Sequence, residues 1–258
     1  MLPLVAYTDK LSVQPGGSLA VKVSSYGARQ YRADLRRIIQ GDRNPEGPGF
    51  KDQVIVPDLC GVRSAHHQPI RPGSYVQVVD EAGVLADLRD FCLVVPVFPT
   101  LTGGHERTLV NIGLGAIELL LTADGTPRIV LGGTALDLSE PLKLREWTIL
   151  VASYESASEG LHLARVAPDG RILEAAMRTA GYGGVRVSSP AVLIGASGAG
   201  ERCFDGKIDS PLLFNRVLTP PEAFNRATLR GQLPLSPDLV AYWDFSREIM
   251  SGRIVDSS

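Results

Sequence analysis

The chain has 258 residues, of which 21% are charged, and a formal net charge of -2 at pH 7. This length suffices for one large β domain or two smaller ones with a sizeable core, and the near-neutral charge argues against nucleic acid or an acidic membrane surface as a partner. The three cysteines are widely spaced and form no C-x-x-C pair, which argues against a disulfide framework or a zinc site.

The first residues and the hydropathy favour a cytoplasmic protein. The start, MLPLVAYTDKL, has a short apolar run with no basic region before it, so we expect no signal peptide. No apolar run approaches the roughly 18–20 residues that a membrane-spanning helix needs. We therefore expect a cytoplasmic location and no membrane partner.

Residues 1–68 predict a small β-rich unit, for which an immunoglobulin-like arrangement is one option. Residues 11–23 contain two alternating apolar runs around a Pro-Gly-Gly turn, which is typical of two strands. Residues 31–42 fit either a strand or a helical turn, and residues 43–50 have the composition of a loop. The segment 66–73, rich in Pro and Gly, marks the seam to a second unit.

The second unit, residues 69–258, predicts some ten short strands separated by turns. Asp124-Gly125 and Asp169-Gly170 are the strongest hairpin signals in the chain. Thr219 and Glu222, with two prolines between them, form a capping box that predicts one short helix near 220–229. Together these features predict an all-β fold, a two-sheet jelly-roll sandwich.

Two motifs invite a catalytic interpretation that their surroundings argue against. The glycine-rich loop at 195–201, GASGAGE, lacks the Lys-Ser/Thr of a phosphate-binding loop, and no helix is predicted after it. It also fails as a nucleophile elbow, because Ala199 stands where the second glycine belongs. We interpret it as an inter-strand loop, and Glu222 as a helix cap.

The four histidines suggest no metal site. Adjacent His66 and His67 cannot both point to one side of a strand, and no carboxylate follows at metal-ligand spacing. His162 alternates with two leucines, so it faces solvent or the other sheet. His105 belongs to no recognisable triad of Ser, His and Asp.

Asp205 and Asp209 are the carboxylates that a glycoside hydrolase on this fold would need. Paired acids of that class lie about 5–10 Å apart, and the spacing of i and i+4 allows one face of a strand. Gly206 interrupts the strand between them, however, so Asp205-Gly206 is interpreted as a turn. We predict that Asp209 anchors backbone or a neighbouring turn.

Trp147 and Trp243 lie in apolar segments, where core packing explains them better than a sugar-stacking role. Asp244 points away from its aromatic neighbours, and a surface residue, a turn anchor and a calcium ligand remain open for it. Calcium binding by Asp209 is likewise left open. The residues themselves therefore assign no catalytic, cofactor-binding or metal-binding site.

The order of motifs in the second unit resembles a laminin G-like domain, which has the concanavalin A-like jelly roll. The resemblance covers about residues 70–250 and is carried by F-x-G-x-I-D at 204–209, the helix start and Trp243-Asp244-Phe245. The segment PLKLREWTILVASYE at 141–155 resembles the central strand with its lead-in. This resemblance implies a fold and leaves the function open, because such domains bind sugars, proteins or nothing further.

A second resemblance covers nearly the whole chain. The segments AYTDKLSVQPGGSLAVKVSS, YRADLRRIIQGDRNPEGPG, RPGSYVQVVD, FDGKIDSPLLF and YWDFS resemble the N-terminal part of the large subunit of N,N-dimethylformamidase. That family is an amidohydrolase that cleaves dimethylformamide to dimethylamine and formate. The resemblance implies a mononuclear iron, held by tyrosine and glutamate in a catalytic domain that lies C-terminal to the matched region.

Three functions follow as hypotheses. The first is a non-catalytic scaffold and assembly region of a dimethylformamidase-like large subunit, with the rest of that subunit, a small subunit or further copies as partners. The alternative is a free-standing laminin G-like module that binds carbohydrate or protein. The third is a hydrolase in its own right, whose active site one sequence does not display. No cofactor is expected in this region.

Overall fold

The computed structural model describes residues 3–56, 60–68, 73–179, 185, 187–229, 236–249 and 251–258. It divides into two compact units, Met1–Arg71 and Pro72–Ser258. The boundary predicted between residues 68 and 69 adjoins positions 69–72, which lie outside the described residues.

The first unit consists of three two-stranded antiparallel sheets. They pair β1 (Leu4–Thr8) with β2 (Val21–Ser25), β3 (Gln30–Ala33) with β6 (Gly61–Ser64), and β4 (Arg36–Gln40) with β5 (Lys51–Val54). Each described strand here has one partner, whereas the sheets of an immunoglobulin sandwich have three or more strands. Among the described residues of this unit, Ser25 and Ala65 alone are buried. The unit therefore holds almost no core of its own.

Two expectations for this unit need correction or refinement. The first apolar run of 11–23 is not a strand: Leu11 is fully exposed, and β2 pairs instead with β1, at the start of the chain. A loop can show the same alternation of apolar and polar residues as a strand, because over so short a segment a few residues are enough to produce the pattern. The segment 31–42, for which a strand or a helical turn was open, forms strands β3 and β4, and residues 43–50 form the predicted loop.

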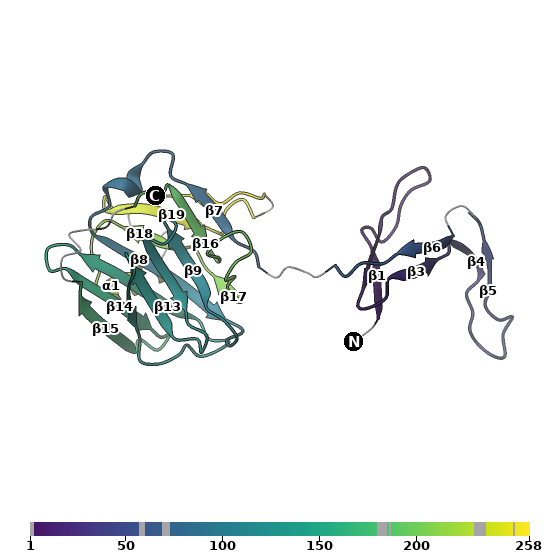
Figure 1. Ribbon diagram of the computed structural model, residues 1–258, viewed down its shortest axis with the longest axis horizontal. Coiled ribbons are helices and arrows are strands. Elements are labelled where there is room, and N and C mark those ends of the chain that lie inside the picture. Colours follow the sequence, from purple (N-terminus) through teal and green to yellow (C-terminus); the bar gives the residue numbers. More distant parts are fainter. Residues whose placement is uncertain are drawn as a thin grey trace. The chain divides into compact units, whose positions relative to one another are not determined.

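The second unit is a sandwich of two antiparallel sheets, which confirms the predicted all-β jelly roll (Figure 1). The larger sheet has the order β15 (Ile172–Arg178), β14 (Gly160–Val166), β13 (Thr148–Glu155), β8 (Phe91–Pro99), β18 (Leu212–Phe214), β19 (Leu239–Asp244), β20 (Val255–Asp256), with β17 (Gly206–Ile208) also paired to β8. The smaller sheet has the order β12 (Thr134–Asp137), β11 (Pro127–Leu131), β10 (Ile117–Leu121), β9 (Arg107–Ile112), β16 (Ala191–Ile194), β7 (Val76–Val79). A short 3-10 helix, Val84–Asp87, follows β7.

The central strands β8 and β13 of the larger sheet are buried on both faces, which explains their continuous apolar sequences. In β8, alternate residues such as Leu93 and Val95 point into the core between the sheets. The residues that alternate with them, such as Cys92 and Val94, point outward into a second apolar cluster beneath helix α1 (Pro220–Thr228). The segment FCLVVPVF is therefore apolar at successive positions and does not alternate with polar residues.

The smaller sheet, in contrast, keeps one face polar. Strand β11 alternates between buried and partly exposed residues, with Ile129 inward and Arg128 outward. The predicted Asp-Gly turns join β10 to β11 and β14 to β15 as hairpins. Gly125 and Gly170 have φ of 93° and 82°, a left-handed conformation that glycine adopts without strain.

Helix α1 begins as the sequence predicts. Thr219 is the N-cap, its hydroxyl accepts from the Glu222 backbone N–H, and the Glu222 carboxylate accepts from the Thr219 N–H at 2.8 Å. Ala223 and Ala227 are buried against the larger sheet. The small residues bring the helix close to the outer face of the sheet, and its last turn ends beside an uncovered part of that face.

Candidate functional site

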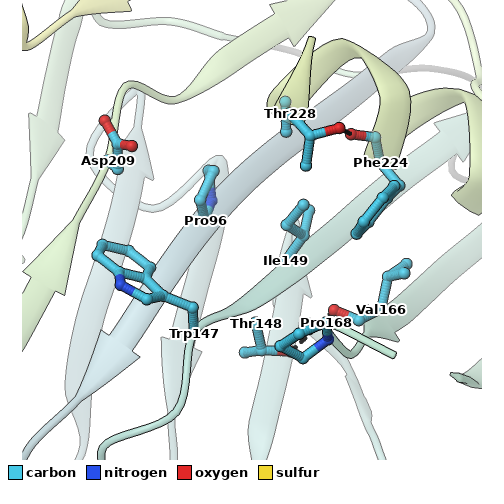
Figure 2. Close-up of a pocket in the computed structure, with 10 residues that line it drawn as sticks. Pro96, Trp147, Thr148, Ile149, Val166, Pro168, Asp209, Phe224 and Thr228 are labelled. Carbon is cyan, nitrogen blue, oxygen red and sulfur yellow. Dashed lines mark hydrogen bonds between the residues drawn. The ribbon is translucent and has the colours of Figure 1, made fainter. Parts of the chain in front are cut away.

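A groove of about 400 Å³ lies on the outer face of the larger sheet, beside α1 (Figure 2). Figure 2 shows Trp147 and Asp209 on one side of it, Phe224 and Thr228 of the helix on the other, and Pro96 and Ile149 between them. We call it the α1 groove; its ten described lining residues are Pro96, Trp147, Thr148, Ile149, Val166, Pro168, Asp209, Phe224, Ala227 and Thr228.

The strand register aligns the floor of the α1 groove in one row that crosses β14, β13 and β8 and ends at Asp209, the residue after β17. The Asp209 N–H donates to the Pro96 carbonyl at 3.0 Å, so these residues are cross-strand neighbours. Ile149 pairs with Pro96 on one side and with Val166 on the other. Three inter-strand spacings of about 4.8 Å make this row about 14 Å long. Asp209 stands at one end and Val166 at the other.

Trp147 is the residue whose predicted role is wrong. It is 40% exposed and lines the groove, whereas Trp243 is buried as predicted. Trp147 directly precedes β13 and lies on the same outward face as Ile149, two residues later. The sequence pattern could not distinguish this outer face from the inner one, because both faces of the sheet are apolar.

A second row on the same face, two residues further along the strands, holds Trp147 in place. Its ring lies 5.5 Å from that of Phe98, tilted by 50°, and the Lys207 ammonium lies 5.3 Å from the centroid of the Phe98 ring. Lys207 and Phe98 are cross-strand neighbours on β17 and β8. Trp147 is thus packed by aromatic contact on one side and open to the groove on the other.

Asp209 has the anchoring contacts that the sequence predicted, and also lines the groove. Its carboxylate accepts from the Ser210 hydroxyl at 2.9 Å. The same hydroxyl accepts from the Phe245 N–H at 3.0 Å, which connects this turn to the end of β19. Ser210 is fully buried and has φ of 41°.

The two threonine hydroxyls of the groove use their hydrogens within the protein. The Thr148 hydroxyl donates to the Val166 carbonyl at 3.0 Å, and the Thr228 hydroxyl donates to the Phe224 carbonyl at 2.8 Å. Among the ten described lining residues, Asp209 is the only ionisable one. Toward a ligand, these hydroxyls and the carboxylate therefore offer acceptors rather than donors.

Asp205, the other half of the candidate acid pair, serves a different contact. Its carboxylate accepts from the buried Arg107 guanidinium at 2.8 Å, and Arg107 also donates to two carbonyls of the loop before β9. The two carboxylates thus have separate partners. Asp205 is positioned as an ion-pair anchor, in the turn before β17.

The glycine-rich segment 195–201 is the loop between β16 and β17, as predicted. Arg202, just after it, donates to the buried carboxylate of Glu118 at 2.7 Å, which also accepts from the Thr108 hydroxyl at 2.7 Å. Glu118 and Thr108 belong to neighbouring strands, β10 and β9, of the smaller sheet. Arg202 therefore attaches the loop to the outer face of that sheet.

The remaining sequence candidates lie apart from the groove. His66, His67, His105 and His162 are exposed, and the His67 ring contacts Tyr26 edge-on at 5.6 Å. Asp244 accepts from the Ser246 N–H at 2.9 Å, which makes it a turn anchor, one of the three roles left open. In the described part of the chain, no three His, Cys, Asp or Glu side chains gather in a metal-binding arrangement.

The three cysteines are free thiols. Cys92 lies in the apolar cluster under α1, and burial raises the pKa of its thiol to about 12. It is accordingly a structural residue rather than a reactive one. None of the helices in the described ranges combines the length and the hydropathy needed to cross a bilayer.

The first unit presents a second candidate surface. It contains fifteen of the 26 exposed large apolar residues described in the chain, although it is about a quarter of the length. It also carries ten Lys and Arg against six Asp and Glu, whereas the second unit has sixteen against 22. This density of exposed apolar side chains favours an interaction site in the first unit.

Comparison with protein families supports the fold. Residues 72–223, more than half of the chain, match the family described as the Concanavalin A-like lectin/glucanases superfamily. The match covers the smaller sheet, the larger sheet except β19 and β20, and the start of α1.

Two curated proteins are similar along nearly the whole chain. The N,N-dimethylformamidase beta subunit of Paracoccus aminophilus is 27% identical over 94% of this chain and 35% of its own length. The corresponding beta subunit from an Alcaligenes species is 25% identical over 98% of this chain and 37% of its own length. The chain therefore spans about a third of the length of these relatives.

Solved structures share the fold. A protein from Bacteroides ovatus, provisionally described as carbohydrate-binding, has a TM-score of 0.53 and 14% identity, covering 98% of this chain and 64% of that one. The CBM40 of the Ruminococcus gnavus IT-sialidase, bound to α2,3 sialyllactose, has a TM-score of 0.50 and 16% identity, covering 60% and 92%. At these identities the likeness concerns the fold alone.

Proposed function

The chain belongs to the concanavalin A-like lectin/glucanases superfamily, and from this premise we propose that it is a scaffold and assembly region of an N,N-dimethylformamidase-type amidohydrolase. Its homologues are beta subunits of that enzyme. The role that we propose is binding to the remainder of the large subunit or to a small subunit. The amide cleavage itself belongs, in this proposal, to another part of the enzyme.

One observation carries this proposal: the first unit leaves its apolar side chains uncovered. Val5, Tyr7 and Ile38 are 51%, 67% and 62% exposed. Isolated two-stranded sheets are at best marginally stable in water, and burial of apolar surface is the main favourable term in association. A partner that covers these strands would supply the core that the unit lacks.

Co-purification tests the proposal. The tagged chain is co-expressed with a dimethylformamidase small subunit and with the part of a beta subunit that this chain does not match. We expect at least one of the two to be retained, and Ile38→Asp to weaken that retention at least tenfold. Leu144→Asp, which changes an exposed residue of the second unit, is the matched control.

Two results would contradict the proposal. If Ile38→Asp and Leu144→Asp reduced the retention of the partner equally, the first unit would have no specific role in assembly. Iron binding and dimethylformamide hydrolysis by the purified 258-residue chain would overturn the non-catalytic role.

The alternative function, a module that binds carbohydrate or protein, has the exposure of Trp147 in its favour, because an exposed tryptophan beside a groove can stack on a ligand. A glycan array probed with the wild-type chain and with Trp147→Ala tests the carbohydrate form of it. Glycan binding that is lost in the variant would support this alternative, and an array without signal would remove it.

A further inference from the structure

We propose that strand β15 is a self-association surface, at which two copies of the chain pair edge to edge, antiparallel, about a two-fold axis. The inference rests on the free edge of this strand, on its charge pattern and on the apolar residues beside it. Every residue that carries it belongs to the second unit, so it is independent of the first unit and of the proposed assembly role.

Strand β15 is the longest edge strand described in the second unit. It has seven residues, whereas β7, β12 and β20, at the other described sheet edges, have four, four and two. Among the described strands, β14 is its only neighbour. Natural edges avoid pairing through proline, bulges, inward-pointing charges or short length. Strand β15 contains no proline, keeps an unbroken register with β14 and has only apolar residues on its inward side.

The register with β14 shows which backbone groups of β15 face the free edge. The Thr179 N–H donates to the Glu159 carbonyl and the Ala167 N–H donates to the Arg171 carbonyl, so the odd-numbered residues make the hydrogen bonds with β14. In an antiparallel ladder, the residues between them point their N–H and C=O groups the other way. These are the even-numbered residues of β15: Ile172, Glu174, Ala176 and Arg178.

The charges on this edge are complementary between two copies. When Ala176 lies opposite its own counterpart, Glu174 lies opposite Arg178 of the second copy, and the two-fold axis repeats this pair. Within the described ranges, Glu174 belongs to no ion pair. The Arg178 side chain is 80% exposed and lies 3.8 Å from the Glu159 carboxylate, a surface contact that contributes little. The three opposed pairs of this register exchange about six backbone hydrogen bonds.

The inward side of β15 leaves apolar surface for the second copy to cover. Leu173, Ala175 and Met177 pack against the core between the sheets, yet they are only partly buried. The sandwich ends here, because β12, which packs against β15 from the smaller sheet, is also an edge strand. In the same register, Ala175 lies opposite Met177 of the second copy. Each strand therefore continues the apolar row of the other.

Sedimentation velocity of the full chain over a series of concentrations tests the association. We expect a reversible equilibrium between monomer and dimer. A chain that stays monomeric up to about 0.2 mM would overturn the proposal, because a dissociation constant above that concentration leaves the edge unpaired under ordinary solution conditions.

Charge reversal tests the register. Glu174→Arg and Arg178→Glu each place like charges opposite one another and should raise the dissociation constant of the dimer at least tenfold. The double variant exchanges the two charges and should restore the wild-type dissociation constant. Glu146→Arg reverses a charge outside β15 and should leave the dimer unchanged. A double variant as weak as the single variants would overturn the proposal.

A second route changes the backbone and leaves the charges in place. Ala176→Pro removes an N–H that faces the free edge and keeps the ladder with β14, so the domain should fold and the dimer should be lost. Ala135→Pro is the matched control. Ala135 is an exposed residue of edge strand β12, and its N–H points away from β11 because the Leu138 N–H donates to the Pro127 carbonyl. Thermal melting of both variants confirms that the domain is folded.

The first unit offers a competing way to associate, through its exposed apolar residues. A dimer that Ile38→Asp weakens and that neither Glu174→Arg nor Ala176→Pro changes would form through the first unit, which would overturn the proposal. A dimer that both β15 variants weaken and that Ile38→Asp leaves unchanged would confirm it. The co-purification described above measures the first unit instead, so each proposal can fail without the other.

Discussion

Ser210 joins two parts of the jelly roll that lie 35 residues apart in the sequence. Its hydroxyl donates to the Asp209 carboxylate and accepts from the Phe245 N–H. The F-x-G-x-I-D motif and the W-D-F motif are thus connected through this buried hydroxyl. These two motifs therefore fix the backbone of the turn at Ser210, and the same hydrogen bonds hold Asp209 at the end of the α1 groove.

Replacement of Ser210 by alanine should therefore destabilise the second unit. The Phe245 N–H would lose its acceptor in a partly buried position, which costs about 1–3 kcal/mol. The free energy of unfolding, from urea denaturation, is the measurement. Ser139→Ala, at an exposed position, should stay within about 0.5 kcal/mol of the wild type; equal losses in both variants would contradict the role of Ser210.

Helix α1 covers the outer face of the larger sheet over Val94 and Val151, and the α1 groove lies beside its C-terminal half. Its start is fixed by a local signal, the Thr219–Glu222 capping box. Its position on the sheet is fixed by Ala223 and Ala227, whose small side chains allow a close approach.

Loss of the cap should weaken this element. Thr219→Ala removes the acceptor for the Glu222 N–H and should lower the free energy of unfolding by about 1 kcal/mol. Asn225→Ala, at an exposed position within the helix, should be neutral or slightly stabilising, because alanine has the higher helix propensity. A destabilising Asn225→Ala combined with a neutral Thr219→Ala would show that the cap contributes nothing.

The cap also predicts a dependence on pH. The pKa of Glu222 is lowered, first by the hydrogen bond from the Thr219 N–H, then by that from its hydroxyl, with smaller effects of Arg216 and Arg226. The ionised carboxylate therefore stabilises the fold above the unfolded pKa of about 4.3, and this contribution is lost as the pH falls through the lower folded pKa.

Glu222→Gln measures that contribution. At pH 7 the variant should be less stable by about 0.3 kcal/mol, a small value because the carboxylate is exposed and screened by solvent. Near pH 3 the difference should shrink. Urea denaturation at both pH values checks this, and a difference that grows on acidification would contradict it.

At the scale of the whole molecule, the two units differ in how their strands are covered. In the second unit, an apolar core separates the sheets, and α1 covers part of the outer face of the larger one. In the first unit, the described strands form three separate pairs with almost no buried side chains. Stability within one chain can vary in this way because it follows local burial.

Hydrogen exchange on the full chain should reveal this difference. Backbone amides of β1 to β6 should exchange close to the rate of an unfolded chain, whereas those of β8 and β13 should be protected to the level of global unfolding. Addition of the assembly partner should protect the first unit. Strong protection of β1 to β6 in the isolated chain would show that these strands have a core of their own.

Several features could be predicted from local signals in the sequence. The capping box specified the start of α1, the Asp-Gly pairs specified two hairpins, and the apolar runs specified the strands of the larger sheet. The segment GKIDSPLLF, however, forms two strands, β17 and β18, because the backbone turns left-handed at Ser210. No periodicity in the segment indicates that break.

By itself, the sequence determined the all-β class, the helix and its cap, and the turns, since these depend on residues close together in the chain. The tertiary structure alone decided that Trp147 faces a groove while Trp243 is buried, that Asp205 pairs with Arg107, and that Asp209 lies at the end of the groove floor. Those outcomes depend on which strands are neighbours and on which face α1 covers. A strand buried on both faces carries no alternation from which either could be inferred.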